Sequence, residues 1–387
     1  MNQQRPILPG AAIGILGGGQ LGRMTAMAAR TLGYDVHALD PDPECPARPV
    51  VDRLVSARFD DAAAAADLAR NCAVITLEIE QIAQASLAAA ARHAPVRPGA
   101  ELVGIVQDRA VQKRWIAAHG FPLGAYADVT GVPVLEDATR RLGSLFVKSN
   151  HGGYDGRSQV RVHTPGDAES AWRALGGRPA VAEQALELEA ELSVLVARAP
   201  GGETAVYPPA LNHHERQVLA WSVIPAPLPS EVTTPAIELA RGIAEAIGLE
   251  GLLAVELFLV RDGRLLVNEL APRPHNSFHE TELACLTSQF EQLVRAVCGL
   301  PLGDTAVLRP AAIVNLFGDL WRDGVPPRFD AALAEPHTRL HLYGKRVARA
   351  GRKMGHISAV GATPEDALAR ARAAAARLVQ GDHRAVT

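Results

Sequence analysis

The chain has 387 residues, of which 48% are hydrophobic and 21% charged, and its formal net charge at pH 7 is −3. Because a single hydrophobic core stops growing at roughly 250 to 300 residues, two or three globular domains are expected. The hydrophobic content excludes an intrinsically disordered chain. The near-neutral charge excludes the overall basic field that dominates non-specific nucleic-acid binding.

The cysteines and the N-terminal segment indicate where the protein works. The 4 cysteines show no CxxC spacing and are too scattered for a disulfide framework, which indicates reduced thiols. Residues 1–10 contain no apolar signal-peptide core, and no later segment approaches the roughly 18 apolar residues of a membrane span. We therefore expect a cytoplasmic protein that binds neither nucleic acid nor membrane.

The first hundred residues alternate short apolar runs with helical stretches. The pattern predicts strands at 12–16, 36–39 and 73–76, and helices at 20–32 and from Asp61 onward. A strand-helix-strand-helix-strand order is typical of a parallel, doubly wound sheet. The sequence therefore predicts an α/β, Rossmann-like N-terminal domain over residues 1–105.

From residue 106 the pattern changes to paired strands mixed with helices, which favours an α+β domain over residues 106–300. A last part, 301–387, contains a Pro-rich linker and predicts a small C-terminal domain. The elements expected after residue 106 are helices at 111–119, 235–247, 283–298 and 364–379, strand pairs at 145–149 with 159–163 and 252–260 with 264–270, and a strand at 340–343.

A glycine motif, Gly17-x-Gly19-x-x-Gly22, follows the first strand and opens the first helix, and Asp40 ends the next strand. This is where a dinucleotide-binding fold places its glycine turn and its ribose-binding acid. Glycines let the backbone approach an anion, and a helix N-terminus offers unpaired N–H groups. A dinucleotide, another phosphorylated ligand and a purely structural turn all remain open from this pattern.

A second pattern places two carboxylates opposite each other. Asp262-Gly263 favours a two-residue hairpin turn, and in that register Glu256 faces Glu269 with Cβ atoms about 4.5 to 5.5 Å apart. The repulsion between two such charges is relieved by a shared proton or, better, by a hard cation. Mg²⁺ typically takes one or two carboxylates plus substrate phosphates, so a Mg²⁺ site is the preferred interpretation over a structural or protonated pair. Asn268 joins it only if the strand ends or bulges there.

A third pattern is a glycine-rich hairpin loop. Lys148 ends a strand, and residues 149–158 carry three glycines before the next strand begins. This composition predicts a mobile lid over a ligand, with Lys148 suited to a phosphate. A surface hairpin with a solvated lysine is the alternative.

Four motifs, in matching order from about residue 12 to the final helix, resemble the N5-carboxyaminoimidazole ribonucleotide synthetase family of the ATP-grasp superfamily. They are Gly17–Met24, Gly152–Arg157, Asn268–Ser277, and Tyr343–Lys345 with Arg352–His356. The glycine loop or the Asn-Glu pair alone would indicate only an ATP-grasp enzyme. The resemblance implies an ATP-grasp fold with an N-terminal pre-ATP-grasp domain and a C-terminal domain that completes the ribonucleotide site.

The resemblance also implies a reaction. In that family ATP phosphorylates bicarbonate to carboxyphosphate, and the exocyclic amine of 5-aminoimidazole ribonucleotide is then carboxylated during purine biosynthesis. ATP, Mg²⁺ and bicarbonate are the implied cofactors and co-substrate, and a homodimer is the implied assembly. On physical grounds alone, another ATP-grasp ligase or formate-using transferase and an NAD-dependent oxidoreductase remain alternatives.

Site residues are implied position by position. The implied Mg²⁺ ligands are Glu256 and Glu269, and the implied ATP contacts are Arg109, Lys148, Gly153, Glu183, Gln184, Ala185, Leu186, Glu191, His214 and Asn268. The implied ribonucleotide contacts are Gly19, Gln20, Leu21, Glu78, His275, Asn276, Ser277, Lys345 and Arg352. The implied catalytic residues are Tyr154, Asp155, Arg157 and Arg273.

Among the catalytic candidates, Asp155 is the expected acceptor of the amine proton, with a turn-forming role as its alternative. Phe278, Ser158 and Ala185 depart from the family, which commonly has glycine at these positions. The departures bear on the loop motion and on the pocket shape more than on the reaction.

Overall fold

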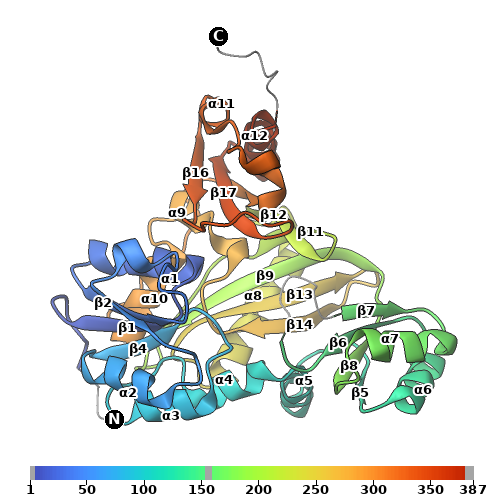
Figure 1. Cartoon of the computed structure of the whole chain (residues 1–387). Helices are drawn as coiled ribbons and strands as arrows, with labels where there is room; N and C mark the ends of the chain where they lie inside the picture. Colours follow the sequence, from blue (N-terminus) through green and yellow to red (C-terminus); the bar gives the residue numbers. More distant parts are fainter. Residues whose placement is uncertain (1–4, 153–158, 380–387) are drawn as a thin grey trace.

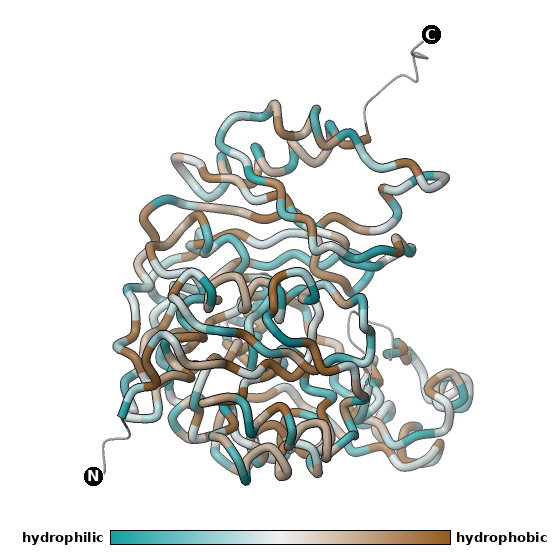
Figure 2. Tube along the Cα trace, turned by 60° about the vertical axis from the view of Figure 1, so that its left-hand side comes forward, coloured by the Kyte–Doolittle hydropathy of each residue, from teal (hydrophilic) through white to brown (hydrophobic). Residues whose placement is uncertain are grey.

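The computed structural model describes residues 5–152 and 159–379, which form three β-sheets flanked by helices (Figure 1). None of the helices in this described part of the chain has the length and apolar character needed to span a membrane. Hydrophobic and hydrophilic stretches alternate throughout the trace, as expected for segments that bury only one side (Figure 2).

The N-terminal sheet is parallel, with strand order β3-β2-β1-β4, so the predicted doubly wound sheet is confirmed. The chain moves from β1 to one side and then returns to the other, which places a topological switch point beyond the ends of β1 and β4. Its elements are β1 (Ala12–Leu16), α1 (Gln20–Thr31), β2 (Asp35–Asp40), β3 (Arg53–Ser56), α2 (Ala62–Arg70), β4 (Val74–Leu77) and α3 (Gln84–Ala91).

A small antiparallel sheet with order β5-β8-β6-β7 lies on the other side of the molecule (green in Figure 1). Two helices, α4 (Ala100–Gln107) and α5 (Arg109–Ala118), connect it to the N-terminal part. The predicted pairing of 145–149 with 159–163 is confirmed. The elements of this part are β5 (Tyr126–Val129), α6 (Val132–Leu142), β6 (Leu145–Ser149), β7 (Gln159–Val162), α7 (Ala168–Ala174) and β8 (Ala180–Gln184).

The largest sheet has nine strands and joins the middle of the chain to its C-terminal part. β12 pairs with β15, so the segment after residue 300 continues this sheet rather than forming one of its own. The strands are β9 (Leu188–Arg198), β10 (Thr204–Val206), β11 (Ala210–Glu215), β12 (Val218–Ile224), β13 (Gly251–Val260), β14 (Leu265–Ala271), β15 (Ala311–Phe317), β16 (Thr338–Leu342) and β17 (Lys353–Val360).

Helices cover both faces of the central strands β9 and β13. Alternate residues pack into two separate cores, so Leu252 and Ala254 face the core that holds α10, whereas Leu253 and Val255 face the core that holds α8. Burial on both sides explains the apolar run Leu252–Val255 that precedes Glu256 in β13. The helices of this part are α8 (Ser230–Ala246), α9 (Thr281–Ala284), α10 (Gln289–Cys298), α11 (Phe329–Leu333) and α12 (Pro364–Arg377).

Two helix predictions are wrong in part. The helix expected over 283–298 is broken into α9 and α10, because Cys285 forms an isolated bridge with Val307 and Ser288 starts a new helix by accepting the Glu291 amide. The helix expected from Pro235 begins at Ser230 instead, with the proline inside its second turn.

Candidate active site

The glycine turn after β1 is filled by carboxylates of the protein itself. Asp40 Oδ2 accepts the Gly18 amide at 2.7 Å, and the two oxygens of Glu78 accept the Gly19 and Gly22 amides at 2.7 and 2.9 Å. These amides would otherwise be available to a phosphate. The structure therefore favours a structural role for these amides, and Asp40 faces the turn rather than a ribose.

Close packing explains why glycine occupies the turn. A Cβ at Gly19 would lie 2.5 Å from Glu78 Oε1, and one at Gly22 would lie 2.6 Å from the Gly17 carbonyl oxygen. Gly17 itself has φ 104°, a conformation that other residues rarely adopt. Gln20 is half-buried and begins α1 directly after Gly19 of this turn.

The β13–β14 hairpin brings Glu256 opposite Glu269, as predicted, but by another route. The turn has three residues rather than two, because Val260 donates to the Arg264 carbonyl at 2.9 Å and Gly263 takes φ 86°. A bulge at Asn268 then shifts the register back by one residue. The bulge also turns Asn268 into the site, where its Nδ2 donates to Glu256 Oε2 at 3.2 Å.

The two hairpin carboxylates differ in their partners. His275 Nε2 lies 3.1 Å from Glu256 Oε1. Burial would raise the pKa of Glu256, but the hydrogen bond from His275 and the charge of His214 lower it below its usual value. Among the described residues, the Glu269 side chain forms no hydrogen bond or ion pair. One ionised carboxylate beside one uncommitted carboxylate suits a hard cation better than a shared proton.

Basic side chains lie next to this pair. Lys148 Nζ is 3.1 Å from Glu183 Oε2, and Lys113 Nζ is 3.4 Å from the same oxygen. Lys113 also donates to the Asn268 carbonyl at 2.8 Å. Burial lowers the pKa of Lys113, and the charge of Glu183 opposes that effect.

Lys113 is a residue that sequence reasoning missed. It lies four positions after Arg109, on the same face of α5, and this helical spacing was the available signal. Arg109 in turn donates to the Ser149 carbonyl at 2.8 Å, at the start of the glycine-rich loop.

The predicted ATP contacts at the end of β8 lie in a segment that is held by backbone hydrogen bonds. The Gln184 and Ala185 amides donate to the Ala125 and Ser144 carbonyls at 2.9 and 2.8 Å. Across the site, His214 Nδ1 lies 2.7 Å from Glu191 Oε2. Burial would lower the pKa of His214, but the hydrogen bond to Glu191 raises it, and a register shift in β11 directs this side chain.

The first and last sequence motifs meet at the opposite end of the site. Leu21 and Met24 of α1 pack with Phe290 and Tyr343 in one buried cluster. A second link is the ion pair between Arg273 Nε and Glu80 Oε1 at 2.7 Å, which joins the end of β14 to the segment after β4.

Two basic residues of the C-terminal part, Lys345 and Arg352, lie in the loop that follows Tyr343 of this cluster. Lys345 donates to the Lys353 carbonyl at 2.7 Å, and Arg352 donates to the Val347 carbonyl at 2.8 Å. Both side chains are partly buried in the loop that follows Tyr343. This loop begins directly after Tyr343, which packs against the N-terminal helix α1.

The segment His275–Ser277 is tied into a buried polar network that sequence reasoning missed. Ser277 Oγ lies 2.7 Å from His275 Nδ1 and donates to Ser193 Oγ at 3.0 Å. Asn276 exchanges amide hydrogen bonds with Asn315 at 3.1 and 2.6 Å. The side chains of Asn276 and Ser277 are thus engaged with the protein, and their contact with a ribonucleotide stays a prediction. The network also contains Asn212 of β11 and Ser222, a polar residue within the otherwise apolar strand β12.

Gly153, Tyr154, Asp155 and Arg157, together with Ser158, lie outside the described residues. Phe278 is fully buried, with its ring 6.2 Å from that of Tyr207, so this departure from the family fills a core position.

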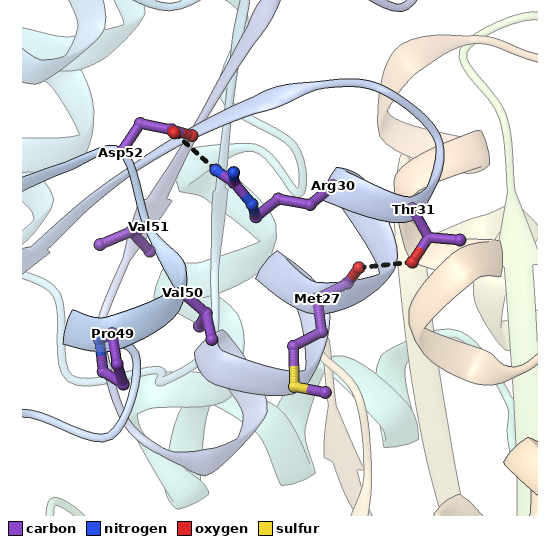
Figure 3. Close-up of a pocket in the computed structure, with 7 residues that line it drawn as sticks. All are labelled: Met27, Arg30, Thr31, Pro49, Val50, Val51 and Asp52. Carbon is purple, nitrogen blue, oxygen red and sulfur yellow. Dashed lines mark hydrogen bonds and ion pairs between the residues drawn. The ribbon is translucent and has the colours of Figure 1, made fainter.

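A surface depression of about 420 Å³ lies apart from all these residues (Figure 3). It is lined by Met27, Arg30, Thr31, Pro49, Val50, Val51 and Asp52. Its two charged groups, Arg30 and Asp52, are already paired with each other. No residue of the predicted site lines it.

Comparison with known proteins covers nearly the whole chain. Residues 11–107 match the ribonucleotide synthetase preATP-grasp domain, residues 114–290 the ATP-grasp domain, and residues 311–370 the phosphoribosylaminoimidazole carboxylase C-terminal domain. The N5-carboxyaminoimidazole ribonucleotide synthase of Bacillus subtilis is 41% identical over 93% of this chain and 94% of its own length.

Solved structures agree in sequence and in fold. An ADP complex of an N5-carboxyaminoimidazole ribonucleotide synthetase has 39% identity and a TM-score of 0.89, with 96% of this chain and 98% of that chain covered. An Aspergillus clavatus synthase, in complex with ADP and 5-aminoimidazole ribonucleotide, has 30% identity and a TM-score of 0.89, with 95% and 98% covered. With these matches and the ATP-grasp architecture, the chain belongs to the N5-carboxyaminoimidazole ribonucleotide synthase family.

Proposed function

We propose that this protein is an ATP-grasp ligase that uses ATP and bicarbonate to carboxylate the exocyclic amine of 5-aminoimidazole ribonucleotide. The observation that carries the proposal is the facing pair Glu256 and Glu269, with one ionised and one uncommitted carboxylate beside Lys148. Phosphoryl transfer depends mainly on positioning and on neutralising charge, which is what such a cluster supplies.

The nucleotide half of the site would bind ATP. Lys148 and Arg109 would contact its phosphates, the hinge Glu183–Leu186 its adenine, and Glu191 with His214 its ribose. Glu256 and Glu269 would hold Mg²⁺, with Asn268 beside them, and the uncommitted oxygens of Glu269 fit that ion. When bound, the ion neutralises negative charge on the phosphates.

The other half would hold the ribonucleotide. Gln20, Leu21 and Glu78 lie at the glycine turn beside Gly19, whose amide Glu78 already binds. Lys345 and Arg352 would supply positive charge for the ribonucleotide phosphate. Arg273 and the segment His275–Ser277 lie between the two halves, since Arg273 is paired with Glu80 and His275 contacts Glu256. This continuity supports one site shared by both substrates.

The proposed chemistry has two steps. A bicarbonate oxygen attacks the γ-phosphorus of ATP, which forms carboxyphosphate and releases ADP. The amine nitrogen then attacks the carboxyl carbon, phosphate leaves, and Asp155 accepts the amine proton. Tyr154, Gly153 and Arg157 would close over this labile intermediate and exclude water.

Other expectations remain proposals of the same kind. We infer a division into an N-terminal domain over 1–105, an ATP-grasp domain over 106–300 and a C-terminal part over 301–387. We also infer a cytoplasmic homodimer. The oxidoreductase alternative loses its support, because Asp40 and Glu78 already occupy the turn that a dinucleotide would need.

A coupled assay of ADP release tests the proposed function. The purified protein is given MgATP and bicarbonate, with and without 5-aminoimidazole ribonucleotide. We expect ADP release to depend strongly on the ribonucleotide. Turnover that ignores it would show that the acceptor is another molecule, and an absence of turnover would reject the ligase.

A further inference from the structure

A second group of metal-ligating side chains lies between α9 and the C-terminal strands, away from the hairpin carboxylates. His341 of β16 and His356 of β17 are directly opposite each other, with their rings stacked at 5.1 Å. Glu282 of α9 faces them, and one ligand atom from each of the three residues lies within 4.8 Å of the others. Figure 1 shows α9 at the foot of these two strands.

The spacing between His341 and Glu282 suits coordination better than a hydrogen bond. Nδ1 of His341 is 3.6 Å from Glu282 Oε2, which is too long for a hydrogen bond. Two ligands of a tetrahedral zinc ion, each about 2.0 to 2.1 Å from the metal, are roughly 3.3 to 3.4 Å apart. The present distance is close to that value. Glu282 is 21% exposed, so a small side-chain movement could close the difference.

His356 has an outer hydrogen-bond partner on the ring nitrogen that would not bind the metal. The Tyr343 hydroxyl lies 2.9 Å from His356 Nδ1, which leaves Nε2 as the candidate ligand atom.

A third imidazole supplies an independent observation. Gln289 Oε1 accepts the His275 amide, so its Nε2 is a donor, and this nitrogen lies 2.9 Å from His279 Nδ1. His279 Nδ1 must then accept, and the ring proton sits on Nε2. That N–H is fully buried, has no hydrogen-bond partner among the described residues, and belongs to a ring 4.9 Å from that of His356. A buried donor without an acceptor is costly and points to a ligand that is not part of the chain.

We propose that Glu282, His341 and His356 bind a divalent transition metal ion of the zinc type. Two imidazoles and one carboxylate favour zinc over Mg²⁺, and three protein ligands leave a fourth position for water. Such a water would accept a hydrogen bond from the buried Nε2–H of His279. The ion would brace α9, which follows the His275–Ser277 segment, against the strands that lead to Lys345, and so act as a structural tie rather than a reacting centre.

Zinc binding by the full-length protein tests this proposal. Metal is first removed with a chelator, and Zn²⁺ is then titrated in the presence of saturating Mg²⁺ and ADP, so that the hairpin carboxylates are occupied. We expect one zinc ion per chain, and Glu282→Gln should weaken its binding by at least about tenfold. His93→Gln, which removes an exposed histidine outside the cluster, should leave zinc binding unchanged.

Two outcomes would overturn the proposal. One is a wild-type protein that binds no zinc, and the other is a correctly folded Glu282→Gln variant that binds it as tightly as the wild type. If the variant does not fold, X-ray absorption of the zinc-loaded wild type decides. A first shell containing two imidazoles supports the site, and a shell without imidazole rejects it.

Discussion

Two pairs of carboxylates in this protein have different roles, although they carry the same chemical group. Asp40 and Glu78 lie at the glycine turn, and their oxygens accept the amides of Gly18, Gly19 and Gly22. Glu256 and Glu269 lie on the β13–β14 hairpin, where Glu269 has no partner among the described residues. The carboxylate oxygens of the first pair are occupied by backbone amides, whereas the second pair keeps lone pairs that a ligand can use.

The comparison teaches that sequence motifs alone do not reveal whether a carboxylate is free. The turn carries a glycine fingerprint for an anion, yet the anion it holds in this structure is Glu78, which comes from 59 residues further along the chain. The hairpin carries a weaker motif, but its chemistry is open. Each of the following predictions tests one side of this contrast.

The largest effect is expected at the open pair. Glu269→Gln removes a proposed Mg²⁺ ligand while keeping the shape of the side chain, so ADP release should fall by at least about 10²-fold to 10³-fold. Circular dichroism should show an unchanged fold. Glu238→Gln, at an exposed position of α8, is the matched control. Near-native turnover of Glu269→Gln would rule out the metal assignment.

The next effect concerns Lys113, which donates to the Asn268 carbonyl next to Glu269. Lys113→Met removes one of the two lysines that neutralise the buried Glu183 carboxylate, and it also removes the donor to the Asn268 carbonyl. The free energy of unfolding should therefore drop by about 3 to 5 kcal/mol. Chemical denaturation measures this loss. Arg114→Met breaks an exposed ion pair on the same helix and should cost less than about 1 kcal/mol.

A double variant sharpens the interpretation of Lys113. Adding Glu183→Gln to Lys113→Met removes the buried carboxylate that only Lys148 would still neutralise, so part of the lost stability should return. If the two substitutions are simply additive, the buried interaction between Lys113 and Glu183 is not what stabilises this region.

A smaller effect is expected at Asp40, one of the two carboxylates that bind the amides of the glycine turn. Asp40→Asn places an amide where the carboxylate accepts the Gly18 and Asp42 backbone amides, so stability should fall by about 1 to 3 kcal/mol. The rate at saturating substrate should stay at the wild-type level. Asp35→Asn, exposed at the start of β2, serves as the control. A loss of turnover without a loss of stability would show that Asp40 is a ligand-binding residue after all.

The smallest effect is expected at Asp52, a partly exposed carboxylate that pairs with Arg30 (Figure 3). The Val36 amide and the Arg30 guanidinium hold the pKa of Asp52 below its usual value. Its stabilising effect is therefore present above the unfolded pKa of about 3.9 and is lost as the pH falls through the lower folded value.

Thermal unfolding across pH measures this contribution. Asp52→Asn should destabilise the protein by less than about 1 kcal/mol at pH 7, because the ion pair is largely exposed. The difference from the wild type should shrink as the solution becomes more acidic than about pH 4. A difference that grows with acidity would have the wrong sign for a depressed pKa.

Local patterns accounted for much of the fold. The N-terminal sheet followed from its alternation of strands and helices, and the hairpins followed from paired apolar runs. The pairing of β12 with β15 did not, since nothing local in either strand indicates a partner so far along the chain. The break between α9 and α10 likewise depends on the distant Val307.

The hairpin carboxylates show how a correct prediction can rest on an incorrect step. The two-residue turn assumed for Asp262-Gly263 has three residues, and the bulge at Asn268 compensates for the extra one. The facing of Glu256 and Glu269 survived because these two shifts cancel. Lys113 and the Ser193 network escaped notice because their partners are close in space but remote in sequence.

A crystal structure of the protein with Mn²⁺ and ADP tests the central contrast most directly. Manganese takes the place of magnesium, and its anomalous scattering shows where the ion binds. We predict a peak between the carboxylates of Glu256 and Glu269, with Asp40 and Glu78 still bound to the amides of the glycine turn. A peak at the glycine turn, or none at the hairpin, would contradict the account.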